Sequence, residues 1–575
     1  MKRNLKFHIP TVIIILSLTA CLILTAWILL RSTGRQTDAK ASSGILANAY
    51  ITGTSDGSIR FLYDGESYEY EGTLAQDYSG IADIEIEDGK IVKLYTKVSS
   101  VSGTLDAYTD STLCIDGYGW VSRNDTLACY QQLEDGSITE ESFSDTVIGV
   151  SCGTFIFENG SVCAVILDEA EAVSDIRVLL KNDNSIFWDS VCLTADAEWT
   201  VSETAGDHSS DNTDEANASD ASSTERNPGE LLAVSDCFAD NIEEICISCD
   251  DGLFWLCDAD GNLISEGYEG ILRIFKTSDG YVLVNQLPLE DYVRYVLPSE
   301  MPASFSFEAL KAQAVCARTF ACSQMKSSVY AQYGANLDDS TSYQVYNAYG
   351  TNETMDQAAA DTCGQILTDN DELVVCYYYS TSPGYTNTTD VWENSNSPDY
   401  LTRRCTLLSS VDQDLSDEGV FTDFICSQPE SYDSASPFYR WSASLNLANI
   451  TDSELGTLQE ITVDTRNASG YITRLICTYE KGSVSLSNEN TIRSLLGTGL
   501  TELTLSDGST RTFTSIPSAC FAITAVDGSR ITLTGGGFGH GIGMSQYGAD
   551  AMGDAGWTYE EILNFYYTGT SIVKL

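Results

Sequence analysis

The stretch DYVRYVLPSEMPASFSFEALKAQAVCARTFACSQ, residues 291–324, contains the residues around which we expect the fold to be organised. Its centre is Glu300, which lies between Pro298 and Pro302 and is followed directly by Met301. A carboxyl group surrounded by hydrocarbon and little water has a raised pKa and suits a general acid. Glu300 is therefore the candidate catalytic residue.

A helix should follow this acid and begin near Phe307. Pro302 cannot continue a helix, whereas Ser304 and Ser306 are favourable N-cap residues. Small and apolar side chains then recur at helical spacing, so another element can approach the helix closely. These side chains are Leu310, Ala314, Ala317 and Ala321.

The string SEMP followed by EALKAQAVCARTFA resembles the stage II sporulation protein D (SpoIID) and LytB amidase-enhancer family. A second stretch, GGGFGHGIGMSQYGADAMGDAGWTYEEILNFYYTG at residues 535–569, is similar to the closing motif of that family. Two separated motifs in the same order argue against a chance match. The resemblance implies a mixed α+β catalytic domain over residues 173–575.

The resemblance also implies that Lys311 and Arg318, which match cations of the family motif, orient substrate. The alternative for both is a helix salt bridge, and Glu308 stands three residues before Lys311 as an available partner. Some family members hold zinc in a loop after this helix. Here residues 338–343 read DDSTSY, without Cys or His, so we predict no metal and no other cofactor.

The segment YSTSPG at residues 379–384 resembles the HSxSGG motif of the family, with Tyr379 in place of the usual His and Pro383 in place of the first Gly. Ser380 and Ser382 are expected to donate hydrogen bonds to sugar hydroxyls. The alternative is that they cap local turns of the backbone.

The closing motif surrounds His540 with glycines, which lets the backbone come close to a ligand or a strand. A lone His is more often structural than functional, and the motif makes His540 a candidate for substrate binding. Gln546 and Tyr547 are expected to begin a helix and to contact substrate.

The composition excludes some functions. The chain has 575 residues, 83 acidic and 30 basic, and a net charge of −53, which argues against nucleic acid as a partner. A neutral sugar polymer remains compatible. The 18 cysteines are scattered and leave the redox state open. Cys246 and Cys249 form a single CxxC without the further ligands that a structural zinc needs.

Residues 1–31 are predicted to form a membrane anchor with its N-terminus in the cytoplasm. The uncharged run Ile9–Leu30 would span about 33 Å as a helix, enough for a hydrocarbon core of about 30 Å. Cationic side chains precede the run. The alternatives are a cleaved signal peptide and a lipoprotein processed at Cys21. The bulk of the chain would lie outside the cell, joined to the anchor by a polar linker at residues 32–44.

Residues 45–172 are predicted to form a β-rich spacer or binding region made of one or two small barrels. Asp-Gly and Asn-Gly pairs separate short strand-like runs, and IEDGKIV at 86–92 and FENGSVC at 157–163 look like one hairpin used twice. Residues 204–226 have almost no large apolar side chains and are predicted to be a disordered insertion in the domain that follows.

The resemblance implies a lytic transglycosylase that acts on peptidoglycan glycan strands stripped of stem peptides. Glu300 alone would suffice if the C6 hydroxyl of the sugar is the nucleophile, whereas ordinary hydrolysis needs two carboxylates. One alternative is a non-catalytic glycan-binding enhancer of an amidase. The other is a muramidase that uses water and Glu308 or Asp291. Expected partners are glycan strands, a cell-wall amidase and a membrane scaffold protein.

Overall fold

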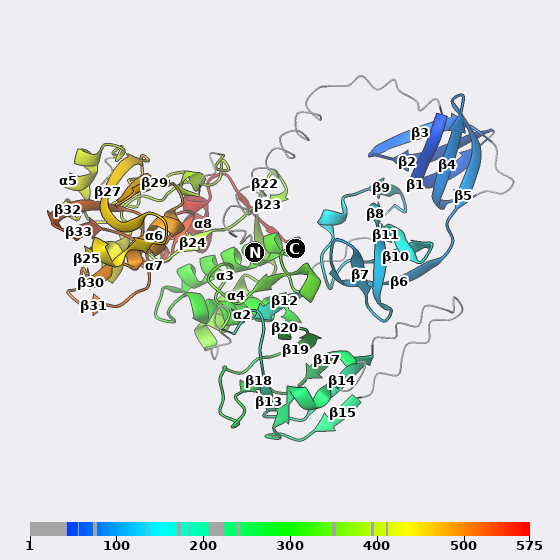
Figure 1. Cartoon of the computed structure of the whole chain (residues 1–575), viewed down its shortest axis with the longest axis horizontal. Coiled ribbons are helices and arrows are strands. Elements are labelled where there is room, and N and C mark those ends of the chain that lie inside the picture. Colours follow the sequence, from blue (N-terminus) through cyan, green and yellow to red (C-terminus); the bar gives the residue numbers. More distant parts are fainter. Residues whose placement is uncertain are drawn as a thin grey trace, which may run out of the picture. The chain divides into compact units, whose positions relative to one another are not determined.

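The computed structural model describes residues 43–55, 57–72, 78–133, 135–168, 174–182, 185–205, 223–238, 242–347, 352–392, 396–409 and 412–575. Two compact units are present, one that ends at Val98 and one from Ser99 to Leu575 (Figure 1). Both are rich in strands, and the second also contains helices, so the class is α+β as predicted. The predicted anchor at residues 1–31 lies outside the described residues, among which no helix is long and apolar enough to cross a membrane.

The first unit is a closed five-stranded barrel, which confirms the barrel predicted for this region. The turns at Asp64-Gly65 and Asp88-Gly89 have positive φ at both residues, as tight hairpin turns of this type require. Ser43 and Gly44, the last two residues of the predicted linker, pair with the fourth strand as part of the first. The strands pair in the order β1 (Ser43–Ser55), β2 (Ser58–Tyr63), β3 (Glu66–Glu71), β5 (Lys90–Thr96) and β4 (Gly80–Glu87).

The second unit begins with a six-stranded sheet in which β11 also pairs in parallel with β8. The predicted hairpin at Asn159-Gly160 joins β10 to β11, again with positive φ at both positions. The strands are β6 (Ser100–Tyr108), β7 (Thr112–Ile115), β8 (Gly119–Gln132), β9 (Ile138–Glu140), β10 (Cys152–Glu158) and β11 (Ser161–Leu167).

A seven-stranded sheet follows, in the order β15-β14-β17-β19-β20-β12-β21. Its strands are β12 (Asp175–Leu180), β14 (Trp199–Ala205), β15 (Ser223–Arg226), β17 (Ile242–Ser248), β19 (Ile271–Thr277), β20 (Gly280–Pro288) and β21 (Leu337–Asp338). A small sheet accompanies it, made of β13 (Cys192–Ala195), β16 (Leu232–Ala233) and β18 (Phe254–Cys257).

Both ends of the predicted disordered insertion at residues 204–226 form strands. Thr204 and Ala205 pair with β17, and 223–226 form β15, which pairs with β14. The prediction was wrong at these ends because backbone pairing at a sheet edge needs few apolar side chains.

A buried charge network fixes the six-stranded sheet to the seven-stranded one. Asp106 of β6 accepts hydrogen bonds from Arg177 of β12 at 2.8 Å and from Arg273 of β19 at 2.5 Å, and Arg273 also pairs with Glu244 at 2.6 Å. Burial opposes ionisation of Asp106, but the hydrogen bonds and charges of the two arginines outweigh it and lower the pKa of Asp106 to about 2.

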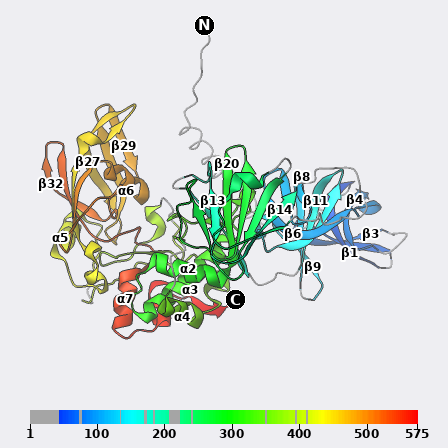
Figure 2. The same ribbon diagram turned by 90° about the horizontal axis from the view of Figure 1, so that it is seen from below.

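Strand β20 leads directly into two helices, α2 (Leu289–Glu300) and α3 (Phe307–Gln324). Helix α3 begins where the sequence predicts, and Ala314, Ala317 and Ala321 are fully buried. Their small size lets α2 and a later helix pack against it, as Figure 2 shows for α2 and α4, and two helices near the C-terminus pack on the side of Ala309 and Ala312. These later helices are α4 (Glu353–Asp361), α7 (Gln546–Asp554) and α8 (Tyr559–Tyr566).

The remaining elements complete the second unit. A five-stranded sheet contains β25 (Trp441–Asn446), β30 (Leu500–Leu505), β31 (Thr510–Arg511), β32 (Phe521–Asp527) and β33 (Arg530–Gly535). A four-stranded sheet contains β26 (Thr451–Asp452), β27 (Gly456–Arg466), β28 (Ile472–Tyr479) and β29 (Gly482–Leu486). Two short sheets join β22 (Gln365–Asp369) to β23 (Glu372–Leu373) and β35 (Ser571–Lys574), and β24 (Tyr378–Tyr379) to β34 (Met544–Ser545). Among the described residues, helices α5 (Glu418–Ser427) and α6 (Glu489–Gly497) are also present.

Candidate active site

Glu300 is the last residue of α2, at the point where the chain turns toward α3. Pro298 lies within the last turn of α2, and Met301, the C-cap residue, is buried. The turn between two packed helices therefore fixes the backbone of Glu300. Glu300 itself is half-buried, so part of its surface stays accessible.

The carboxylate of Glu300 is held by neutral hydrogen-bond donors. The backbone N–H of Val345 donates to Oε1 at 2.8 Å, and the hydroxyl of Tyr378 is hydrogen-bonded to the same side chain. Burial raises the pKa of Glu300 above its ordinary value, and these hydrogen bonds oppose part of the rise. The sequence predicted a raised pKa for Glu300, and the direction of this shift is confirmed.

No cation forms an ion pair with Glu300 among the residues that the structure describes. An adjacent cation would lower the pKa of the carboxyl group and keep it ionised. Without one, Glu300 retains its proton over a wider range of pH. A half-buried carboxyl group of this kind can give a proton to a ligand.

A chain of hydrogen bonds orients the hydroxyl of Tyr378. Nε2 of Gln344 donates to this hydroxyl at 3.0 Å, and the hydroxyl of Tyr292 donates to Oε1 of Gln344 at 3.1 Å. Because the oxygen of Tyr378 accepts from Gln344, its hydrogen is free to point at Glu300. Sequence reasoning missed these residues, since three consecutive tyrosines at 377–379 do not reveal which one reaches the acid.

The two motifs that lie far apart in the sequence meet beside Glu300. Strands β24 and β34 pair in parallel, with Tyr378 opposite Met544 and Tyr379 opposite Ser545. Helix α7 starts directly after β34, and Nε2 of its first residue, Gln546, donates to the backbone carbonyl of Glu300 at 3.2 Å. Gln546 thus contacts the backbone of the candidate acid.

His540 supports this arrangement through Tyr378. Its Nδ1 accepts a hydrogen bond from the N–H of Ile542 at 3.0 Å, and the imidazole is also hydrogen-bonded to the backbone of Tyr378. Burial, with a smaller effect of the Arg493 charge, lowers the pKa of His540 to about 3. The ring also contacts Trp392 at a centroid distance of 5.1 Å. His540 is therefore neutral at ordinary pH and positions Tyr378.

The two predicted serines differ in accessibility. Ser382 is fully buried: its N–H donates to Asp433 at 2.8 Å, and its Oγ accepts from the N–H of Gly384. This is the local capping role named above as the alternative. Ser380 is half-buried, and its carbonyl accepts from the N–H of Tyr547 at 3.0 Å. This backbone bond joins the segment of the two serines to the start of α7.

The cations of α3 are both engaged in ion pairs. Nζ of Lys311 lies 2.6 Å from Glu308 and 4.7 Å from the ring centroid of Tyr559. Arg318 is fully buried, and its guanidinium donates to both carboxylate oxygens of Glu290 at 2.7 and 2.6 Å. Arg318 thus presents no surface to a ligand, and we leave it out of the proposed site. Lys311 and Arg318 thus both form ion pairs within the protein, which is the alternative named above.

Asp433 is a buried acid that the sequence did not single out. It accepts hydrogen bonds from the N–H of Ser382 and from the hydroxyl of Ser545, the N-cap residue of α7. Burial raises the pKa of Asp433 to about 6. This carboxyl group therefore ties the segment after β24 to the start of α7. A lone Asp within a serine-rich loop carries no signal of this role.

The fold and the site together define an α+β protein with an accessible carboxyl group at a helix junction. Residues 277–368 match the family described as "Stage II sporulation protein", and residues 386–543 match a domain of unknown function (DUF8618). Stage II sporulation protein D of Bacillus subtilis (strain 168) is 33% identical over 303 residues, which cover 50% of this chain and 75% of that protein. The chain belongs to the stage II sporulation protein D family.

Two further relatives extend this comparison. The amidase enhancer of Bacillus subtilis (strain 168) is 31% identical over 310 residues, 48% of this chain and 40% of that protein. The chain thus spans less than half the length of this relative. An uncharacterized protein of Brachyspira hyodysenteriae is 30% identical over 53% of this chain and 72% of that protein. The family description and the names of these relatives refer to sporulation and to the enhancement of an amidase.

Proposed function

We propose that this protein is a lytic transglycosylase that cleaves the MurNAc-GlcNAc bond of peptidoglycan strands from which stem peptides have been removed. The observation that carries the proposal is the state of Glu300: half-buried, without an ion-pair partner in the described residues, and raised in pKa. A carboxyl group in this state is suited to act as a general acid.

In the proposed reaction Glu300 first gives its proton to the oxygen that links C1 of MurNAc to GlcNAc, and the C1–O bond breaks. The resulting carboxylate then accepts the proton of the C6 hydroxyl as that oxygen bonds to C1. The product carries a 1,6-anhydro end, and Glu300 regains its proton. General acid-base assistance of this kind contributes about 10²- to 10⁴-fold.

The muramidase alternative needs a second carboxylate about 5 to 10 Å from the first. Asp291 lies nine residues before Glu300 on the same helix, which corresponds to about 13 Å along the axis. Glu308 pairs with Lys311 and accepts the N–H of Tyr559 at 2.8 Å, so its oxygens are engaged. Neither acid suits the role, and a single-acid reaction is the better fit.

The second candidate function is a non-catalytic protein that binds glycan and stimulates an amidase. The observation that favours it is the relative named amidase enhancer. A cell-wall amidase is therefore a proposed partner, and a membrane scaffold protein is proposed on the family resemblance alone. We also retain an anchor at residues 1–31 with the bulk of the chain outside the membrane, a prediction that rests on sequence alone.

Product analysis separates these functions. Purified protein is incubated with glycan strands stripped of peptides, and the products are identified by mass spectrometry. A transglycosylase yields 1,6-anhydro ends, a muramidase yields reducing ends with one added water, and an enhancer yields no cleavage. Absence of anhydro ends with folded protein would overturn the proposal.

A further inference from the structure

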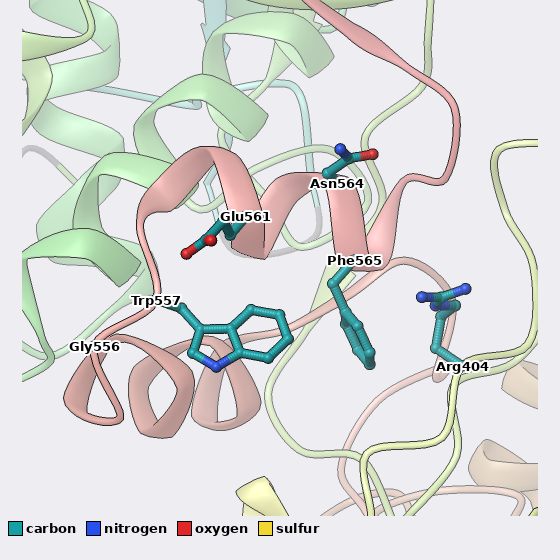
Figure 3. Close-up of a pocket in the computed structure, with 6 residues that line it drawn as sticks. All are labelled: Arg404, Gly556, Trp557, Glu561, Asn564 and Phe565. Atoms are coloured by element: carbon teal, nitrogen blue, oxygen red, sulfur yellow. The ribbon is translucent and has the colours of Figure 1, made fainter.

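We propose that a pocket of about 580 Å³ beside α8 binds a saccharide that bears a carboxylate. The proposal rests on the proposed function only for the identity of the polymer, a glycan whose lactyl carboxylates are free. Figure 3 shows the six residues that line this pocket, which are Arg404, Gly556, Trp557, Glu561, Asn564 and Phe565.

Two aromatic side chains form one wall of the pocket. Trp557 and Phe565 meet edge to face, with ring centroids 5.8 Å apart, and both are half-buried. Trp557 also contacts Tyr432 at a centroid distance of 6.1 Å, which holds its ring in place. Aromatic rings held in this way offer a rigid apolar face with a polar edge, which suits the apolar face of a sugar ring.

Arg404 supplies an available cation. Its guanidinium lies 4.7 Å from the ring centroid of Phe565, and its buried Nε has no hydrogen-bond partner in the described part of the chain. The neighbouring Arg403 instead pairs with Asp412. In a chain of net charge −53, an anionic ligand needs a local cation, and the guanidinium fork fits a carboxylate.

The positive and negative side chains of the pocket lie apart, so a ligand carboxylate has a single favourable position, beside Arg404. In Figure 3, Glu561 and Arg404 lie at opposite ends of the pair formed by Trp557 and Phe565. A ligand carboxylate at Arg404 is thus kept away from the charge of Glu561. Glu561 and Asn564 are exposed. One oxygen of Glu561 accepts the N–H of Thr558 at 3.0 Å, so its other oxygen and the amide of Asn564 can bond sugar hydroxyl or acetamido groups.

This pocket is separate from Glu300. Gln546, which contacts Glu300, begins α7, and Gly556 follows two residues after its end. The nine residues of α7 separate them by about 13 Å along its axis. A single sugar cannot contact both places, so the pocket would bind a different unit of the same strand or hold the strand without cleavage.

The test is direct binding, measured by titration calorimetry on the full chain carrying Glu300→Gln. The probes are an oligosaccharide of alternating GlcNAc and MurNAc without peptides, and the same oligosaccharide with its lactyl carboxylates converted to amides. We expect Arg404→Gln to weaken binding of the first probe by about 10-fold or more, the scale of one charge-assisted bidentate contact. Binding of the amide probe should change little. Arg403→Gln is the matched control and should leave both affinities unchanged.

Equal affinity of the parent and Arg404→Gln for the carboxylate probe would overturn the proposal, as would an equal loss for both probes. If Arg404→Gln does not fold, the salt dependence of the parent decides: only the carboxylate probe should lose affinity as ionic strength rises. These measurements do not depend on cleavage. A negative result for carboxylate binding in the pocket can therefore be distinguished from a negative result for transglycosylase activity.

Discussion

The backbone N–H of Val345 lies 2.8 Å from Oε1 of Glu300, across 45 residues of sequence. This bond fixes one oxygen of the candidate acid on a segment that follows β21. Tyr378, from another part of the chain, is hydrogen-bonded to the same carboxyl group. The side chain of Glu300 is therefore positioned by its own helix, α2, and by the two segments that contain Val345 and Tyr378. Its chemistry depends on all three.

Replacing the acid should slow cleavage strongly without unfolding the protein. For Glu300→Gln we expect the rate of anhydro-product formation to fall by about 10²- to 10⁴-fold, since an amide cannot donate the proton. Mass spectrometry of glycan digests measures the rate. Glu308→Gln is the matched control and should retain most activity. If Glu300→Gln cleaves as fast as the parent, another residue is the acid.

Removing the hydroxyl of Tyr378 should change the pH profile. This hydroxyl lowers the pKa of Glu300, so Tyr378→Phe raises that pKa further. A general acid must be protonated, and activity falls as pH rises through its pKa. The alkaline limb of kcat/KM against pH should therefore move to higher pH in Tyr378→Phe. Tyr377→Phe serves as the neighbouring control, and a shift of the same size there would contradict a specific role for Tyr378.

His540 should make stability depend on pH. Its pKa is about 3 in the folded protein and about 6.5 when unfolded, so between these values the unfolded chain binds more protons. The free energy of unfolding should then decrease by about 1.4 kcal/mol for each pH unit below about 6. Urea unfolding at several pH values measures this slope, and His540→Gln should flatten it. An unchanged slope would show that His540 titrates normally.

Asp106 should stabilise the contact between the first two sheets of the second unit. Asp106→Asn leaves Arg177 and Arg273 buried without full compensation, so we expect a loss of about 3 to 5 kcal/mol. Because the folded pKa is about 2, this contribution is present above about pH 4 and is lost as pH falls toward 2. Denaturant unfolding provides the measurement.

The control for this prediction is Asp145→Asn, which removes an exposed pair with Lys326 at 3.5 Å. Exposed pairs contribute at most about 1 kcal/mol, so this variant should be nearly neutral. Equal effects of the two substitutions would mean that the buried network adds nothing beyond an ordinary surface pair.

Sequence reasoning succeeded where the signal is local. The start of α3 at Phe307 follows from Pro302 and the serines before it, and the hairpins at Asp88-Gly89 and Asn159-Gly160 follow from turn chemistry. Sequence reasoning was less reliable where the role of a side chain depends on how the folded chain packs around it. Arg318 and Ser382 carry the right chemistry for a ligand, yet both are fully buried and bonded to the protein itself.

Residue types a few positions apart were enough to nominate Glu300 as the candidate acid, to predict the helix that follows it and to recognise the family resemblance. The environment of Glu300, by contrast, depends on the folded chain. Val345, Tyr378 and Gln546 reach it from 45 to 246 residues away, and such contacts exist only once the sheets and helices have packed. Burial and long-range hydrogen bonds set the pKa of Glu300, and no local pattern encodes them.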